Sequence, residues 1–203
     1  MASNALSQQE QRTRLAITDS PVARALFNEP RWAWLWFIAR IYVGWTWLSA
    51  GLEKLSDPAW VQNGTALQGF WAHAVAIPAP PAHPAIAFNW YRTFLQFLLN
   101  GGDYTWFAKL ITAGEIAIGV ALILGLFTGI AAFFGGFLNW NFMMAGSASS
   151  NPLLFLIAIL LVLAWKTAGW LGLDRWVLPL LGTPWWRGKI LRTRTRADTA
   201  GQA

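Results

Sequence analysis

Residues 105–126 read TWFAKLITAGEIAIGVALILGL, and this stretch decides the fold class. Its length is close to the ~20 residues that a helix needs to cross the ~30 Å hydrocarbon core of a bilayer. One acidic residue, Glu115, lies at its middle. A charge at mid-bilayer costs at least ~2.5–3.5 kcal/mol, so such a residue usually faces a protein interior or serves a site. The stretch therefore predicts a membrane-spanning helix that packs within a larger bundle.

Three further apolar stretches have a similar length: residues 32–52, 129–147 and 152–170. The chain has 203 residues, of which 56% are hydrophobic and 12% charged, whereas about 25% are charged in an average soluble domain. The alternating segments of ~10 residues that mark a transmembrane barrel do not occur in this sequence. We therefore expect an all-α integral membrane four-helix bundle with an extracytoplasmic helical insertion between its first and second helices.

The basic residues predict how this bundle is oriented. Four arginines precede residue 32 and six basic residues follow residue 174, while residues 53–103 carry only Lys54 and Arg92. Because cytoplasmic segments are richer in Lys and Arg, we place both termini in the cytoplasm and residues 53–103 outside the inner membrane. The expected parts are a cytoplasmic tail over 1–31, a transmembrane domain over 32–180 and a basic cytoplasmic tail over 181–203. The positive charge then matches lipid headgroups rather than nucleic acid, so the lipid bilayer is the expected partner.

Helix signals also occur outside the four apolar stretches. Asp57-Pro58 is typical of a helix start, with Asp as the cap and Pro in the first turn. A second start is expected at Pro84, with a stop at Gly101-Gly102, and a short amphipathic segment near Val22–Phe27. The helix after Pro84 is too short to span a bilayer and too apolar for water, so it should lie on the outer face of the bundle. Two interpretations of the insertion remain: an interfacial cap, or a lid over a substrate or quinone cavity.

Three polar residues fall at one depth of the expected bundle. At 1.5 Å per residue, Arg40 lies about 12 Å, Glu115 about 16 Å and Asn139 about 15 Å from the inner ends of their helices. We therefore expect an Arg40–Glu115 ion pair with Asn139 as an amide partner. This group either only locks the bundle or also binds a quinone headgroup or an anion, and it provides the three candidate catalytic residues.

Other residues extend the candidate site. Trp47 and Lys54 share a face of the first helix with Arg40, and Thr112 shares a face of the second with Glu115. Lys54 and Arg92 carry positive charge at the outer mouth, where they would attract a small anion. The candidate substrate- or quinone-binding residues are therefore Trp47, Lys54, Arg92 and Thr112.

The composition leaves little for a bound metal, haem or nucleotide. The chain has no cysteine and two histidines, both in the insertion, which are fewer ligands than a metal or haem site normally uses. It also has neither a G-x-G-x-x-G nor a P-loop pattern. A membrane quinone that accepts electrons is the one redox molecule that we expect.

Short motifs place the chain beside a known family. The first helix carries Arg40 followed by Gly44, Trp47, Gly51, Lys54 and Leu55, and the second carries Gly114, Glu115, Gly119, Leu122 and Gly125, then Thr128. Gly172-Leu173-Asp174 follows the fourth helix. This pattern, over about residues 32–180, resembles the DoxX-like family of membrane proteins. The long insertion makes it similar to the DoxD-like branch, which includes the membrane subunit of thiosulfate:quinone oxidoreductase.

The resemblance implies a reaction. Two thiosulfates would be coupled to tetrathionate, and two electrons would pass to the membrane quinone. Arg40 would polarise a quinone oxygen or hold an anion, Glu115 would orient Arg40 and relay a proton, and Asn139 would donate a hydrogen bond. A companion subunit or a homo-oligomer is implied as well. Two alternatives stay open: a non-catalytic integral subunit that anchors or assembles a partner redox complex, and a small transporter or channel.

Overall fold

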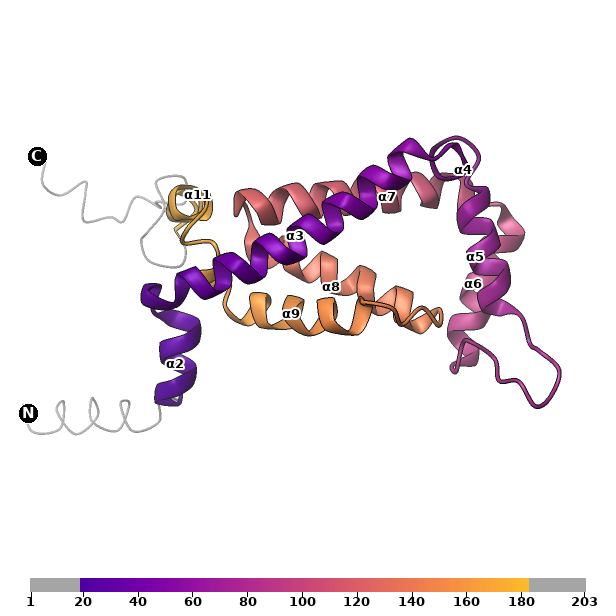
Figure 1. Ribbon diagram of the computed structural model, residues 1–203, viewed down its shortest axis with the longest axis horizontal. Coiled ribbons are helices and arrows are strands. Elements are labelled where there is room, and N and C mark those ends of the chain that lie inside the picture. Colours follow the sequence, from indigo (N-terminus) through magenta and orange to yellow (C-terminus); the bar gives the residue numbers. More distant parts are fainter. Residues whose placement is uncertain (1–18, 183–203) are drawn as a thin grey trace, which may run out of the picture.

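The computed structural model describes residues 19–182, and every regular element in this part of the chain is a helix. The long helices lie along one another as a bundle (Figure 1): α3 (Ala33–Ser56), α7 (Tyr104–Leu124), α8 (Thr128–Met144) and α9 (Asn151–Leu163). The shorter elements are α2 (Pro21–Asn28), η1 (Pro30–Trp32), α4 (Pro58–Val61), α5 (Thr65–Val75), α6 (Asn89–Gly101), α10 (Trp165–Ala168) and α11 (Asp174–Leu180). The expectation of an all-α fold is confirmed.

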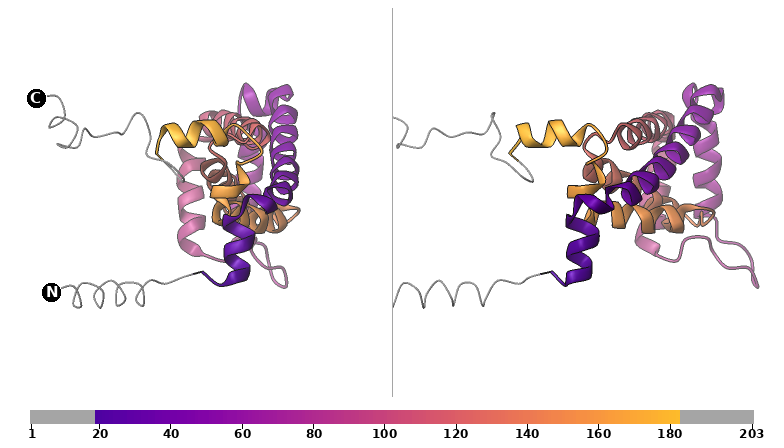
Figure 2. Two further views of the ribbon diagram at one scale, coloured as in Figure 1. Left: turned by 90° about the vertical axis from the view of Figure 1, so that its left-hand side faces the viewer. Right: turned by 60° about the vertical axis from the view of Figure 1, so that its left-hand side comes forward.

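The short helices gather at the two ends of the bundle. At one end, called the terminal end here, lie α2, α10 and α11; at the other, the insertion end, lie α4, α5 and α6 (Figures 1 and 2). Helices α5 and α6 run across the bundle rather than along it. The insertion is therefore a transverse layer on one end of four roughly parallel helices.

Three of the four predicted long helices are present at nearly the predicted bounds. The first continues to Ser56, four residues past its predicted end. The prediction of one helix over 152–170 is wrong, because α9 ends at Leu163 and a short α10 follows. The reason is a tertiary contact: the Thr167 hydroxyl donates to the Phe27 carbonyl at 2.9 Å and so holds α10 against α2. Among the described helices, α7 alone is both long and apolar enough to cross a bilayer, and α9 is apolar but shorter.

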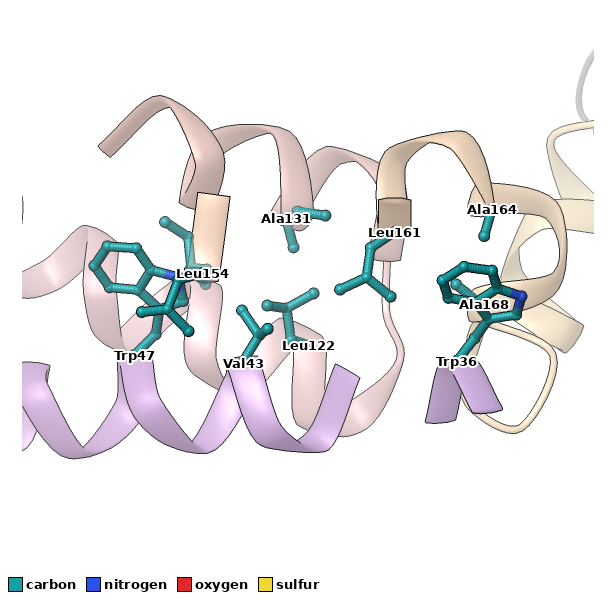
Figure 3. Packing of buried hydrophobic residues seen from close by; sticks show 11 residues of the cluster. Trp36, Val43, Trp47, Leu122, Ala131, Leu154, Leu161, Ala164 and Ala168 are labelled. Atoms are coloured by element: carbon teal, nitrogen blue, oxygen red, sulfur yellow. The ribbon is translucent and has the colours of Figure 1, made fainter. Parts of the chain in front are cut away.

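Close glycine contacts set the spacing of α3 and α7. A Cβ on Gly119 would lie 2.6 Å from the Leu48 nitrogen and 2.8 Å from the Gly44 carbonyl oxygen, so only a glycine allows this approach. Beside this crossing, Val43 and Leu122 lie at the centre of the bundle core (Figure 3). The core also contains Trp36, Trp47, Ile118, Ala131, Ala132, Leu154, Leu161, Ala164 and Ala168.

A second apolar core joins the insertion to the bundle. Its buried members are Leu67, Trp71, Ala74, Val75, Ile86, Tyr91, Leu95, Leu98, Ala108 and Ala145. The Tyr91 hydroxyl donates to the carbonyl oxygen of Asn141 on α8 at 3.0 Å. Burial raises the pKa of Tyr91 to about 12, which favours the protonated phenol that donates this hydrogen bond. The insertion is thus fastened to the end of α8.

Two of the predicted helix starts are confirmed and one is wrong. The Asp57 carboxylate accepts from the Ala59 nitrogen at 2.9 Å and caps α4, and α2 covers the amphipathic segment near Val22–Phe27. The start expected at Pro84 is displaced to Asn89, because residues 82–88 form a non-helical connection whose Ile86 carbonyl accepts from Arg92 at 2.6 Å. Most of the predicted tails, residues 1–18 and 183–203, lies outside the described residues.

Candidate functional site

Glu115 pairs with Lys54. The Lys54 Nζ lies 2.9 Å from the Glu115 Oε2, where α3 and α7 pack together at Gly51. Glu115 is 1% exposed, while the Lys54 side chain is 19% exposed and reaches the insertion end, where its ammonium lies 5.1 Å from the centre of the Trp60 ring. The expected Arg40–Glu115 ion pair is therefore wrong: the acid is neutralised by the lysine one turn beyond Gly51.

Arg40 is buried at the other end of the bundle. Its Nη2 donates to the Leu171 carbonyl at 2.9 Å, and its guanidinium lies against Gly125 and Gly172. Gly51 lies eleven residues further along α3, or about 16 Å along the helix axis. The depth prediction failed because it counted from the inner ends of the helices, whereas α3 begins well before the level at which α7 ends.

Residues 171–174, which we call the clasp, close the terminal end around Arg40. The Asp174 carboxylate accepts from the Phe127 nitrogen at 2.6 Å and from the Thr128 nitrogen at 2.9 Å, so it caps the first turn of α8. The Leu173 and Asp174 nitrogens donate to the carbonyls of Leu124 and Gly125 at 3.1 and 2.8 Å. Asp174 is also the acid whose charge acts on Arg40. Sequence reasoning noted residues 172–174 as a motif but gave no partner for them.

Asn139 and Trp47 carry buried polar atoms without internal partners. Within the described part of the chain, neither Asn139 Nδ2 nor Asn139 Oδ1 makes a hydrogen bond, and the same is true of Trp47 Nε1. A Cβ built on Gly135 would lie 2.9 Å from Trp47 Nε1, and Gly135 precedes Asn139 by one turn of α8. The indole N–H therefore lies about one helical turn from the amide.

Glu115 lies at the level of Asn139. Helices α7 and α8 are antiparallel neighbours, and Ile118 on α7 packs against Gly135 on α8. Glu115 is one turn from Ile118 toward the insertion end, and Asn139 is one turn from Gly135 in the same direction. The structure therefore gathers Lys54, Glu115, Trp47 and Asn139, which we call the polar layer, and leaves Arg40 out of it.

The other two predicted site residues have local partners. Thr112 is buried one turn from Glu115, and its hydroxyl donates to the Ala108 carbonyl at 2.9 Å. Arg92 donates to the Ile86 carbonyl at 2.6 Å and to Asn89 Oδ1 at 2.9 Å, which fastens the start of α6. Thr112 thus stays beside the polar layer, while Arg92 holds the insertion together.

The polar layer can hydrogen-bond and exchange protons. The indole and the amide supply N–H donors, the amide and Glu115 supply oxygen acceptors, and Lys54 joins the layer to the exposed end. No group of three His, Cys, Asp or Glu side chains in residues 19–182 could hold a metal ion. The arrangement suits an uncharged ligand that accepts hydrogen bonds and takes up protons when it is reduced.

Comparison with known proteins identifies the family. Residues 35–146 match the DoxX family, and this range is more than half of the chain. It contains the whole polar layer but not the clasp. No curated protein and no solved structure matches the chain. The chain therefore belongs to the DoxX family and is a membrane protein with an all-helical fold.

Proposed function

We propose that this protein is a quinone-linked membrane oxidoreductase subunit of the DoxD-like type, with the quinone headgroup held in the polar layer and thiosulfate as its electron donor. The observation that carries the proposal is the fully buried Asn139 amide, which has no partner among the described residues and lies close to the equally unpartnered Trp47 N–H. An unpaired buried polar group costs about 1–3 kcal/mol. A quinone carbonyl would accept from both N–H donors and remove their part of that cost.

The proposed topology has four spans, formed by α3, α7, α8 and α9 with α10. Arg24, Arg31 and Arg175 all belong to elements at or beside the terminal end, which supports a cytoplasmic location for that end and for both termini. Large apolar side chains are exposed along all four helices, as expected for lipid contact. The insertion end, and with it Lys54, then faces outward.

The reaction balances with the groups at hand. Two thiosulfate dianions form one S–S bond and give up two electrons, and the quinone takes up these electrons with two protons to become the quinol. Asn139 and Trp47 orient the carbonyl, and the Lys54–Glu115 pair relays a proton next to it. Lys54 is the group of the layer that reaches the surface, so it both attracts the anionic donor and joins Glu115 to solvent. Arg40 is left with a positioning task at the clasp.

The decisive experiment separates a ligand site from a packing defect. Asn139→Leu replaces the unpartnered amide by an apolar side chain with the same branched arrangement of heavy atoms, so we expect equal or higher thermal stability together with at least a tenfold loss of quinone affinity, or about 1.4 kcal/mol. Quinone content of the purified protein and thiosulfate-dependent reduction of a soluble quinone are the measurements.

Thr128→Val is the matched control on the same helix. Thr128 Oγ1 is also buried without a partner in the described residues, but it lies at the terminal end of α8. The control should keep quinone binding unchanged. Full quinone binding in Asn139→Leu would refute the assigned site. If the purified protein has neither bound quinone nor turnover, the protein is a non-catalytic subunit that anchors a partner. Solute flux in liposomes would indicate a transporter instead.

A further inference from the structure

Helix α6 has three distinct faces. Tyr91, Leu95 and Leu98 recur at the spacing i, i+4, i+7 and are buried in the second apolar core, mainly against α5. The polar residues Asn89, Thr93, Gln96 and Asn100 are exposed on the opposite face. A helix that lay on the bundle in plain water would need only these two faces.

The third face is an exposed aromatic stripe. Trp90, Phe94 and Phe97 recur at the same spacing and are 59%, 45% and 72% exposed. At 3.6 residues per turn, this stripe lies about 100° around the helix from the buried one. It therefore points sideways, neither into the bundle nor directly away from it.

The stripe continues into the exposed apolar face of α8. The ring of Tyr91 contacts those of Trp90 and Phe94 at centroid distances of 5.5 and 6.1 Å, and that of Trp140 on α8 at 6.2 Å. Trp140 stacks in turn on Phe137 at 6.2 Å. Beyond Phe137, α8 exposes Phe134, Phe133 and Ile130. In a membrane protein such a face contacts lipid, so the stripe is the continuation of a lipid-contacting surface.

Charge and direction agree with this surface. The only charged residue of α6 is Arg92, and its guanidinium is tied to Ile86 and Asn89 within the insertion. The helix runs across the end of the bundle, so its axis lies roughly in the plane of a membrane whose normal follows the long helices (Figure 1). Aromatic rings are favoured at the level where headgroups meet acyl chains.

We propose that the stripe of Trp90, Phe94 and Phe97 is a membrane-docking surface that lies in the headgroup–acyl boundary of the leaflet at the insertion end. The occupant is lipid, and helix α6 is an in-plane interfacial helix with its polar face toward water. This inference rests on the proposed four-span topology, but the surface is separate from the polar layer and does not depend on quinone chemistry.

The absence of cysteine from the sequence makes a clean experiment possible. Single spin labels are placed at Phe97→Cys, at Gln96→Cys on the polar face, and at Phe133→Cys on α8, in the full chain reconstituted into phosphatidylcholine vesicles. Collision with oxygen, which dissolves in lipid, is compared with collision with a water-soluble nickel chelate. We expect the ratio of oxygen to nickel collisions at label 97 to be at least fivefold higher than at label 96 and lower than at label 133, because position 97 lies at the boundary and position 133 within the span.

Each contrary result has a definite meaning. Equal access of nickel to labels 97 and 96 would show that the stripe faces water and would overturn the proposal. A label at 97 protected from both reagents would show that another protein covers it, and spin–spin broadening would identify that protein as a second copy. Phe94→Cys repeats the measurement one turn away, and thermal unfolding verifies that each labelled chain is folded.

Discussion

Three fully buried ionisable side chains in the described part of the chain each rely on a different neighbour. Glu115 has Lys54, Arg40 has the Leu171 carbonyl and the nearby charge of Asp174, and Asp174 has two backbone N–H groups of α8. A buried charge that loses its partner costs about 3–5 kcal/mol, whereas removing both partners is often much cheaper. The loss of stability caused by each substitution therefore depends on whether it leaves a buried charge without a partner.

Lys54→Met should lower the free energy of unfolding more than Glu115→Gln does. The first change leaves a fully buried carboxylate alone, whereas the second leaves an ammonium that already reaches the surface. The double variant should lose less than the sum of the two single changes. Thermal unfolding in detergent provides the three values.

Arg40→Met combined with Glu115→Gln is the control pair. Because about 16 Å of helix separates their levels, their effects should add within about 0.3–0.5 kcal/mol. If the coupling energy between Arg40 and Glu115 were as large as that between Lys54 and Glu115, the assignment of Lys54 as the partner of Glu115 would be wrong.

The shared level of Glu115 and Asn139 could be predicted from the sequence, and the place of Arg40 could not. Helices α7 and α8 are joined by a short turn at Gly125–Phe127, so counting residues from that turn gives the correct level for both side chains. Helix α3 is joined to α7 only through the long insertion, and nothing in its sequence gives its offset along α7. The reach of Lys54 back to Glu115 depends on that offset.

At the scale of elements, glycines that lack a Cβ allow the close contact of α3 with α7. Gly119→Ala places a methyl group against the Leu48 nitrogen and the Gly44 carbonyl, so we expect it to destabilise the protein by at least about 1–3 kcal/mol. Gly114→Ala, five residues earlier on the same helix, has no heavy atom within 4 Å of the new Cβ. It should be neutral or stabilising by up to about 1 kcal/mol, because alanine is the better helix former. Equal melting temperatures for the two variants would contradict this account of the crossing.

Tyr91 gives the insertion a dependence on alkaline pH. Its pKa is about 12 in the folded protein, against 10.0 as its ordinary value, so folding favours the protonated phenol. That contribution is fully present below pH 10 and is lost as the pH rises toward 12. The stability difference between the unmodified protein and Tyr91→Phe, about 0.5–1.5 kcal/mol at neutral pH, should therefore shrink over this range. A difference that stays constant to pH 12 would mean that the phenol is not held as described.

Helix α5 shows where pattern reasoning ends at this scale. Its N-cap is Gly64 with φ of 70°, and the residue that caps its first turn lies one position earlier: Asn63 Oδ1 accepts from the Thr65 nitrogen at 3.0 Å. The usual N-cap residue is therefore absent from the N-cap position itself, and burial of Leu67 and Trp71 in the second core stabilises the helix. Such tertiary support cannot be read from a short window of sequence.

At the scale of the whole molecule, the clasp makes the bundle depend on its last described helix. A chain that ends after Ala168 lacks every contact of Leu171, Leu173 and Asp174, including the cap on α8. We expect it to be lost from membranes or to unfold well below the full chain, and Asp174→Ala should show the same defect in part. A chain that ends after Gly182 retains the clasp and should remain folded. Expression level and thermal unfolding of the three proteins test this, and a stable chain ending at Ala168 would show that the clasp is dispensable.

Arg40 and Leu171 are separated by 131 residues of sequence, so they are synthesised at different times. At about 5–20 residues per second, a ribosome needs roughly 7–26 s to go from one to the other. Throughout that interval the arginine is already made, while the carbonyl and the carboxylate that will surround it are not. The terminal end of the bundle thus closes only after residues 171–174 have been made, and a nascent chain interrupted before residue 171 exposes an unmatched charge in an apolar helix. Quality-control proteases that respond to such charges would remove incomplete chains while sparing finished ones.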